Sequence, residues 1–183
     1  MLVVAVGLTG CTLANQPTTE APGSSHDPQA IYNALLNTPF KASELPAGFT
    51  SPATNANASD DYLQKFNVLG GVEITMKGPD AYNFINYWVY PTPEDAKRHF
   101  EQHISTDNAY FASTSLAPYP AVCAEYLARA ADARYGATYC KVLVGVVEVF
   151  GVSWIQNSTR YGNADNAVQL ALAGISHLNS LLK

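Results

Sequence analysis

The stretch ATYCKVLVGVVEVFGVSW, residues 137–154, decides the fold, because its nearly continuous run of valine and other apolar residues is typical of strands inside a sheet. Such a run breaks most readily at glycine, which weakens the interior of a strand. Gly145 and Gly151 are therefore the two places at which we expect the run to divide into separate strands.

The preceding stretch, YPAVCAEYLARAADARYG (residues 119–136), has two interpretations. Its alanines favour a helix that ends at Gly136. Cys123 and Cys140, however, lie at equal distances from Ala131–Asp132, as facing positions of a β-hairpin do. We favour a hairpin strand, and the helix remains the alternative.

Two further strands are expected earlier in the chain. In residues 66–77 apolar and polar side chains alternate, which predicts a half-buried strand, and Gly70 and Gly71 mark a bulge or a close approach. A turn at Gly78–Asp80 leads into YNFINYWVY, residues 82–90, which is apolar or aromatic at both parities. The second strand is therefore expected to have aromatic side chains on both faces of the sheet.

Three segments are expected to form helices, because apolar residues recur in them at helical spacing. The first two begin at residues that suit a helix start. The segments are a short helix from Pro28 that ends before Pro39 and has Asp27 as its cap, a helix over 92–104 with Ala96, Phe100 and Ile104 on its buried side, and a C-terminal helix over 163–183.

The order of these elements is α-β-β-α-β-β-β-α, which is typical of an α+β fold. We expect an antiparallel sheet of about five strands with helices packed on one face. Residues 28–183 are predicted to form a single domain of this kind, with a long loop over residues 41–61.

The chain begins with a short apolar run, Leu2–Leu8, which Cys11 follows closely. The run is far shorter than the roughly 20 residues that span a bilayer, so residues 1–10 are predicted to be a signal peptide. Residues 11–27 contain Gln, Thr, Glu, Pro, Gly and Ser with almost nothing to bury. This composition predicts a disordered tether.

The tetrapeptide Leu8-Thr9-Gly10-Cys11 resembles the lipobox of bacterial lipoproteins, in which small residues precede a cysteine. The resemblance implies that the Cys11 thiol receives a diacylglycerol, that the chain is cut just before it, and that acyl chains hold the protein to the membrane. No Lys or Arg precedes the apolar run, so we expect the true start to lie upstream. The alternatives are that Met1 is genuine and export is inefficient, or that Cys11 is a buried cysteine beside an ordinary strand.

The remaining cysteines and the net charge agree with this location. Cys123 and Cys140 form an even pair, which in an exported protein predicts a disulfide, and no Cys/His cluster accompanies them to bind zinc. The formal net charge of -5 provides no basic patch for nucleic acid or for anionic lipid head groups. We therefore expect an extracytoplasmic protein of the bacterial cell envelope, attached by its acyl chains.

Local catalytic motifs do not point to an enzyme, because the sequence contains no G-x-S-x-G and no H-E-x-x-H. His99 and His103 are four residues apart in one predicted helix and could bind a metal together, with Asp95 as a further ligand. Surface histidines that flank an apolar stripe explain the pair equally well. Glu73 and Glu148 lie in strand patterns, where a buried carboxylate with a raised pKa could act as a general acid, but each is more simply an outward-facing residue. We expect no cofactor.

Aromatic residues are dense in the predicted strand over 82–90, and they lie on both of its faces. One face can be core under the helices, whereas the other needs a cover. A ligand groove or a partner protein would provide this cover, and so would the loops over 41–61 or 106–118. The candidate ligand-binding residues are Tyr82, Phe84, Tyr87, Trp88 and Tyr90.

Two classes of function follow from these observations. The first is a non-catalytic, lipid-anchored binding or sensing module that contacts an apolar ligand, a glycan or an envelope protein through the aromatic strand. The second is an envelope enzyme whose catalytic groups meet only in the folded protein. A cleft that holds His99, His103 and a carboxylate would favour the enzyme, and the lack of a local motif favours binding.

Overall fold

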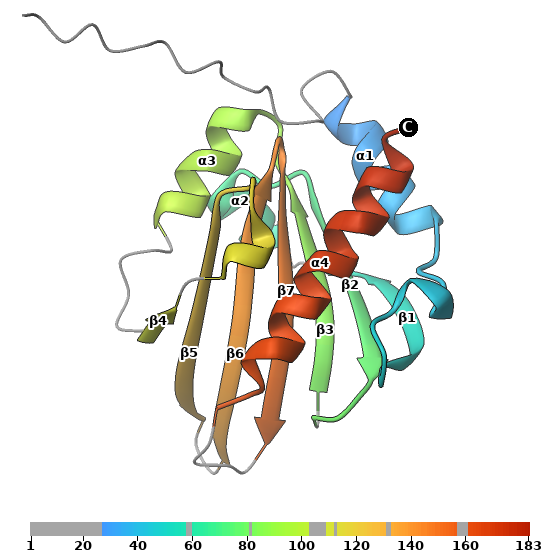
Figure 1. Ribbon diagram of the computed structural model, residues 1–183. Helices are drawn as coiled ribbons and strands as arrows, with labels where there is room; N and C mark the ends of the chain where they lie inside the picture. Colours follow the sequence, from blue (N-terminus) through green and yellow to red (C-terminus); the bar gives the residue numbers. More distant parts are fainter. Residues whose placement is uncertain are drawn as a thin grey trace, which may run out of the picture.

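The computed structural model describes residues 27–57, 60–80, 82–102, 109–111, 113–130, 133–156 and 161–183. These residues form four α-helices, two short 3-10 helices and seven strands (Figure 1). The helices are α1 (Pro28–Asn37), α2 (Asp60–Phe66), α3 (Pro93–Gln102) and α4 (Ala164–Leu181), with the 3-10 helices η1 (Ala42–Glu44) and η3 (Thr114–Leu116). The strands are β1 (Thr50–Ala56), β2 (Gly70–Lys77), β3 (Tyr82–Val89), β4 (Ala109–Phe111), β5 (Ala121–Ala130), β6 (Ala133–Val144) and β7 (Val147–Gln156).

The strands form one antiparallel sheet in the order β1-β2-β3-β7-β6-β5-β4 (Figure 1). Most of the valine-rich stretch forms β6 and β7, which lie inside the sheet and pair from Val144 and Val147 onward. Gly145 lies in the turn between them and has a φ of 60°, a left-handed conformation that glycine adopts without strain. The stretch is therefore a hairpin, and it turns at the first of its two glycines.

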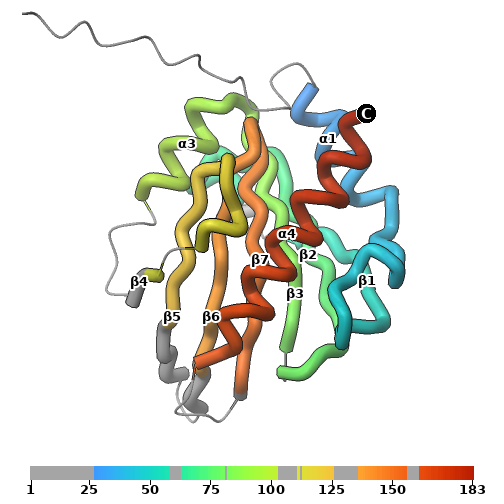
Figure 2. Tube along the Cα trace, in the orientation of Figure 1, coloured from blue at the N-terminus to red at the C-terminus, as the bar shows by residue number. Residues whose placement is uncertain are grey.

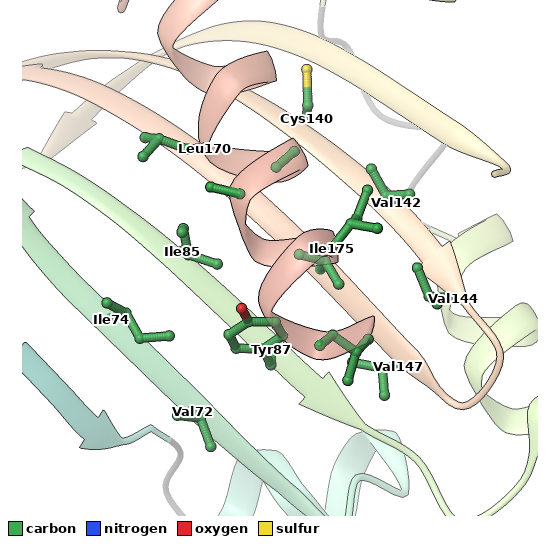
Figure 3. Packing of buried hydrophobic residues seen from close by; sticks show 14 of the residues in the cluster. Val72, Ile74, Ile85, Tyr87, Cys140, Val142, Val144, Val147, Leu170 and Ile175 are labelled. Carbon is green, nitrogen blue, oxygen red and sulfur yellow. The ribbon is translucent and has the colours of Figure 1, made fainter. Parts of the chain in front are cut away.

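Helices α1 and α4 cover one face of the sheet, which we call the helix face. Helix α4 crosses β3, β7 and β6, and α1 lies over β2 (Figures 1 and 2). Gly151 in β7 allows α4 to approach closely, since a Cβ atom there would lie 2.2 Å from the backbone oxygen of Ala167. The main core lies between these helices and the sheet, and Figure 3 shows several of its members, among them Val72, Ile74, Ile85, Val142 and Leu170.

Helices α2 and α3 pack over one end of the opposite face, which we call the far face. Side chains alternate along β7, so Glu148 lies on the far face while Val147 and Val149 lie in the main core. A small second core joins α2 and α3 to the sheet, and its buried members are Val68, Tyr90 and Ala96. Because this core is small, polar contacts carry much of the attachment of α3.

The α+β class and the antiparallel sheet are confirmed, and residues 121–130 form a strand. The described sheet has seven strands where about five were expected. Strand β1 lies within the expected loop over 41–61. Its sequence, TSPATNA, did not predict a strand because it is polar, and the strand lies at the edge of the sheet. The predicted strand over 66–77 begins only at Gly70, since Phe66 ends α2. The structure also places α2 and α3 on the second face of the sheet.

Cys123 and Cys140 confirm the predicted disulfide. They are directly paired in the register of β5 and β6, their Cα atoms are 4.1 Å apart, and both lie in the main core. The hairpin turn at Ala131–Asp132 lies outside the described residues. Closing a loop of this length in the unfolded chain stabilises the fold by roughly 3 kcal/mol in the entropy model.

The predictions for the N-terminus fall on residues that the structure does not describe, including Cys11 and the signal peptide over 1–10. The described chain starts with the predicted cap of α1, since Asp27 Oδ1 accepts a hydrogen bond of 3.1 Å from the backbone N–H of Gln29. Among the helices of the described residues, none is both long and apolar enough to cross a membrane.

Candidate functional site

Five aromatic side chains lie together on the far face of three neighbouring strands, and we call them the aromatic face. Tyr82 and Phe84 belong to β3, Phe150 and Trp154 to β7, and Tyr139 to β6. Tyr82 is 52% exposed, and the other four are half-buried. The ring centroids of Tyr82 and Trp154 are 5.7 Å apart, and those of Tyr139 and Phe150 are 6.3 Å apart. The five therefore give the far face of three neighbouring strands a partly exposed aromatic surface.

Trp88 lies on the same side of β3, at the end of the far face that α2 covers. Its ring packs over Gly71 of β2, where a Cβ atom would come within 2.4 Å of the indole. The close approach expected at Gly71 is therefore confirmed. The ring is half-buried against the small second core, so Trp88 borders the aromatic face.

Two of the five predicted binding residues have no exposed surface. Tyr87 points into the main core, where its Oη donates a 3.0 Å hydrogen bond to the Gly174 carbonyl (Figure 3). Burial raises the pKa of Tyr87 well above its ordinary value. Tyr90 is buried beneath α3. Alternation along the strand turns Tyr87 to the helix face and α3 covers Tyr90, so only Tyr82, Phe84 and Trp88 of the predicted set reach the surface of the far face.

Sequence reasoning missed the other half of the aromatic face. Tyr139, Phe150 and Trp154 stand in the valine-rich stretch, which we interpreted as strands inside a sheet without naming its aromatic residues as binding candidates. All three occupy the parity that faces away from α4, and this alternation is the signal that would have identified them.

Polar side chains continue the far face beyond the aromatic residues. Glu73 of β2 lies directly opposite Asn86 of β3 and Asn55 of β1. Asn57 donates from its Nδ2 to Asn86 Oδ1 at 3.3 Å. Glu73 is half-buried, and this burial raises the pKa of its carboxyl group. Amide and carboxyl groups therefore border the aromatic face on one side.

A buried polar network lies under α3. The His99 Nδ1 atom is 3.1 and 3.0 Å from the two carboxylate oxygens of Glu148, and 2.6 Å from Tyr90 Oη. Tyr90 Oη also donates to Glu148 Oε2 at 3.1 Å. His99 is only 3% exposed, and Glu148 is completely buried. The alternative that His99 is a surface histidine and the interpretation of Glu148 as an outward-facing residue are wrong, because α3 covers this end of the sheet and turns His99 towards it.

Lys141 places a positive charge beside this network. Its Nζ donates a 2.7 Å hydrogen bond to the Phe100 carbonyl and lies 4.5 Å from the centre of the Phe100 ring. Burial lowers the pKa of Lys141 to about 8, although the neighbouring Glu148 acts in the opposite direction. Together with the small second core, these contacts attach α3 to the far face.

A pocket of about 140 Å³ opens between the end of α2 and the side of α3. Arg98 pairs with Asp95, whose Oδ2 also accepts a 2.8 Å hydrogen bond from Thr92 Oγ1. The described lining includes no Ser, Thr or Cys, and therefore no hydroxyl or thiol nucleophile. Around Phe66, the polar residues that line the pocket are Lys65, Asn67, Asp95, Arg98, His99 and Gln102.

The metal hypothesis rested on His99, His103 and Asp95. His103 lies outside the described residues. His99 directs Nδ1 to Glu148, and Asp95 pairs with Arg98. Within the described ranges, no three His, Cys, Asp or Glu side chains are close enough to hold a metal ion, and a site that includes His103 stays a prediction.

No protein-family model matches the chain, and no curated protein matches it in sequence. The function therefore has to follow from the residues of the site, because an α+β fold by itself supports many functions.

Proposed function

We propose that the chain is a lipid-anchored binding module of the bacterial cell envelope that takes a glycan on its aromatic face. The aromatic face itself carries this proposal. Tyr82 is 52% exposed, and half-buried Phe84 and Trp154 adjoin it on the face of the sheet opposite the main core. A contiguous apolar surface with a polar border is typical of an interaction site.

Two features support the location. The resemblance of Leu8–Cys11 to a lipobox supports an acyl anchor, and the buried disulfide between Cys123 and Cys140 is typical of an oxidising compartment outside the cytoplasm. The net charge of -5 gives no attraction to nucleic acid or to anionic lipid. The acyl chains would therefore provide the attachment to the membrane.

The make-up of the far face favours a glycan over an apolar molecule or an envelope protein. A sugar ring has C–H groups that pack on aromatic side chains, and hydroxyl groups that pair with amides and carboxylates. The aromatic face offers the first kind of contact, and Asn55, Glu73 and Asn86 offer the second. An apolar ligand that covered the same surface would remove these polar groups from water without replacing their hydrogen bonds, which is unfavourable.

An enzyme has less support. The pocket beside His99 does bring a histidine close to two carboxylates, Asp95 and Glu148. However, the described lining offers no hydroxyl or thiol nucleophile beside that histidine. Binding is therefore the function that the described residues support best.

A glycan array tests this proposal with the exported chain carrying Cys11→Ser, which removes the acyl anchor. We expect selective binding to a small set of glycans. Tyr82→Ala should weaken that binding by at least about fivefold, because an aromatic contact in an interface contributes on the order of 1–3 kcal/mol.

Tyr161→Ala is the matched control, since Tyr161 is also exposed (39%) and lies in the segment that leads into α4. This variant should bind as the parent chain does. An equal loss in the two variants, or an array on which nothing binds, would contradict the proposal.

A further inference from the structure

We propose that the pocket between α2 and α3 binds a small oxyanion, a phosphate or carboxylate group, with His99 on its inner wall and Arg98 and Lys65 at its rim. The pocket is a second site and does not depend on glycan binding at the aromatic face. The proposal rests on the size of the pocket, the orientation of the histidine and the charges around it.

The size of the pocket limits its occupant to a small group. Its volume of about 140 Å³ is roughly ten times the space of about 10–15 Å³ that a cavity needs to hold one water molecule. It is well below the roughly 300 Å³ and more of sites that hold cofactors or drug-sized ligands. A phosphate, or a short chain that ends in a carboxylate, fits this space.

Contacts on the side of the sheet fix the orientation of the His99 imidazole ring. Its Nδ1 faces Glu148 and Tyr90, and the same ring lines the pocket. The ring of Phe66 packs edge-on against it, with centroids 5.1 Å apart. A carboxylate behind one imidazole nitrogen is how proteins commonly orient the other nitrogen towards a ligand.

The charges around the pocket favour an anion over a cation. Lys65 and Arg98 are exposed cationic residues at its rim. The carboxylate of Asp95 opposes them, but it already accepts hydrogen bonds from Thr92 and Arg98. A guanidinium and an ammonium group, beside an imidazole, are the usual partners of phosphate and carboxylate oxygens. A metal ion would instead have to bind against two positive charges.

Buried charges on the far side of His99 balance each other. Glu148 and Lys141 are both fully enclosed and belong to neighbouring strands, β7 and β6. Because these two charges are opposite, the net charge around the pocket depends on the residues at its rim. The excess at the rim is positive, from Lys65 and Arg98 against Asp95.

The test uses the full chain with Cys11→Ser and follows the imidazole NMR signals of His99 at constant ionic strength. Inorganic phosphate and acetate are added in separate titrations. We expect saturable shifts of the His99 signals with at least one of them. Arg98→Gln and Lys65→Gln should each weaken that binding by about fivefold or more, since each removes a charge-assisted contact from an exposed position that folding does not need.

Lys97→Gln is the matched control. Lys97 also lies on α3, but it is 69% exposed and pairs with Glu101 at 3.8 Å outside the pocket. This variant loses the same charge and should bind phosphate as the parent does. An equal loss in all three variants would show general attraction to a surface charge and would overturn the site. His99 signals that stay unchanged at high concentrations of both anions would overturn it as well, unless the vesicle comparison below moves them.

A parallel comparison identifies the source of the oxyanion. Vesicles of phosphatidylcholine with and without phosphatidic acid are added in place of the free anions. Shifts with free phosphate assign a soluble ligand, and shifts only with phosphatidic acid assign a lipid head group. Either result supports the site, and the absence of both contradicts it.

Discussion

The two faces of the sheet are made by the same strands, yet they differ in how they are covered. In β3, Ile85 and Tyr87 are fully enclosed by α4 on the helix face, whereas Tyr82 and Phe84 on the far face keep contact with solvent. All four are large apolar or aromatic residues. The difference shows that hydrophobicity alone does not separate core residues from surface residues, because the helix that packs on a strand decides which of them are buried.

The faces also differ in the nature of their contacts. On the helix face, glycine and small residues bring α4 so close that backbone atoms define the fit, as at Gly151. On the far face, α3 is attached through a buried histidine, carboxylate and lysine around a small apolar core. We therefore expect the helix face to determine stability and the far face to determine binding.

The largest effect on stability is expected from Gly151→Val. The new side chain would begin 2.2 Å from the Ala167 carbonyl oxygen and 2.3 Å from the Ala171 nitrogen, so α4 would have to move off the sheet. The free energy of unfolding in urea should fall by at least about 3 kcal/mol. Phe150→Leu, at the neighbouring position on the far face, should lower it by less than about 1.5 kcal/mol. Similar losses in both variants would contradict the proposed division between the faces.

A smaller effect, dependent on pH, is expected at Lys141. Its pKa is about 8 in the folded protein against an ordinary 10.5, so the unfolded chain binds more protons between these values. Linkage then makes Lys141 favour folding increasingly as the pH rises through this interval. Relative to Lys141→Met, the parent should gain on the order of 1–2 kcal/mol of stability between about pH 7.5 and about pH 9.5.

Urea titrations of the parent, Lys141→Met and the exposed control Lys97→Met at both pH values measure this gain. Lys97 is 69% exposed, so the control should follow the parent at both values. If Lys141→Met also follows the parent, α3 does not enclose Lys141, and the attachment of that helix to the far face is wrong.

The helix face could be predicted largely from the sequence because its signals are local. The valine-rich run, the symmetric pair Cys123 and Cys140, and the apolar spacing of the C-terminal helix all report on neighbouring residues. The burial of Glu148 could not be predicted, since it depends on α3, which lies about 50 residues earlier in the chain.

Only part of the aromatic face could be predicted, because only that part lies within one short stretch of sequence. Tyr82 and Phe84 stood out within one aromatic strand. The alternation of side chains along β3 places both of them on the far face. Tyr139 and Trp154 come from other strands, and only the pairing of β3 with β7 and of β7 with β6 brings them together. The register of β3 against β7, which a long connection joins, is not encoded in any short stretch of sequence.

The most direct test of the account measures stability and glycan affinity together for Phe84→Ala, with Tyr87→Ala as its counterpart on the opposite face of the same strand. Tyr87→Ala should lower the free energy of unfolding by about 3 kcal/mol or more, as expected for a buried aromatic residue. Phe84→Ala should lower the free energy of unfolding by less than about 1.5 kcal/mol. It should weaken the affinity for the glycan identified on the array by at least about tenfold. A Phe84→Ala protein as unstable as Tyr87→Ala, with unchanged glycan affinity, would show that Phe84 is a core residue and that the far face does not bind.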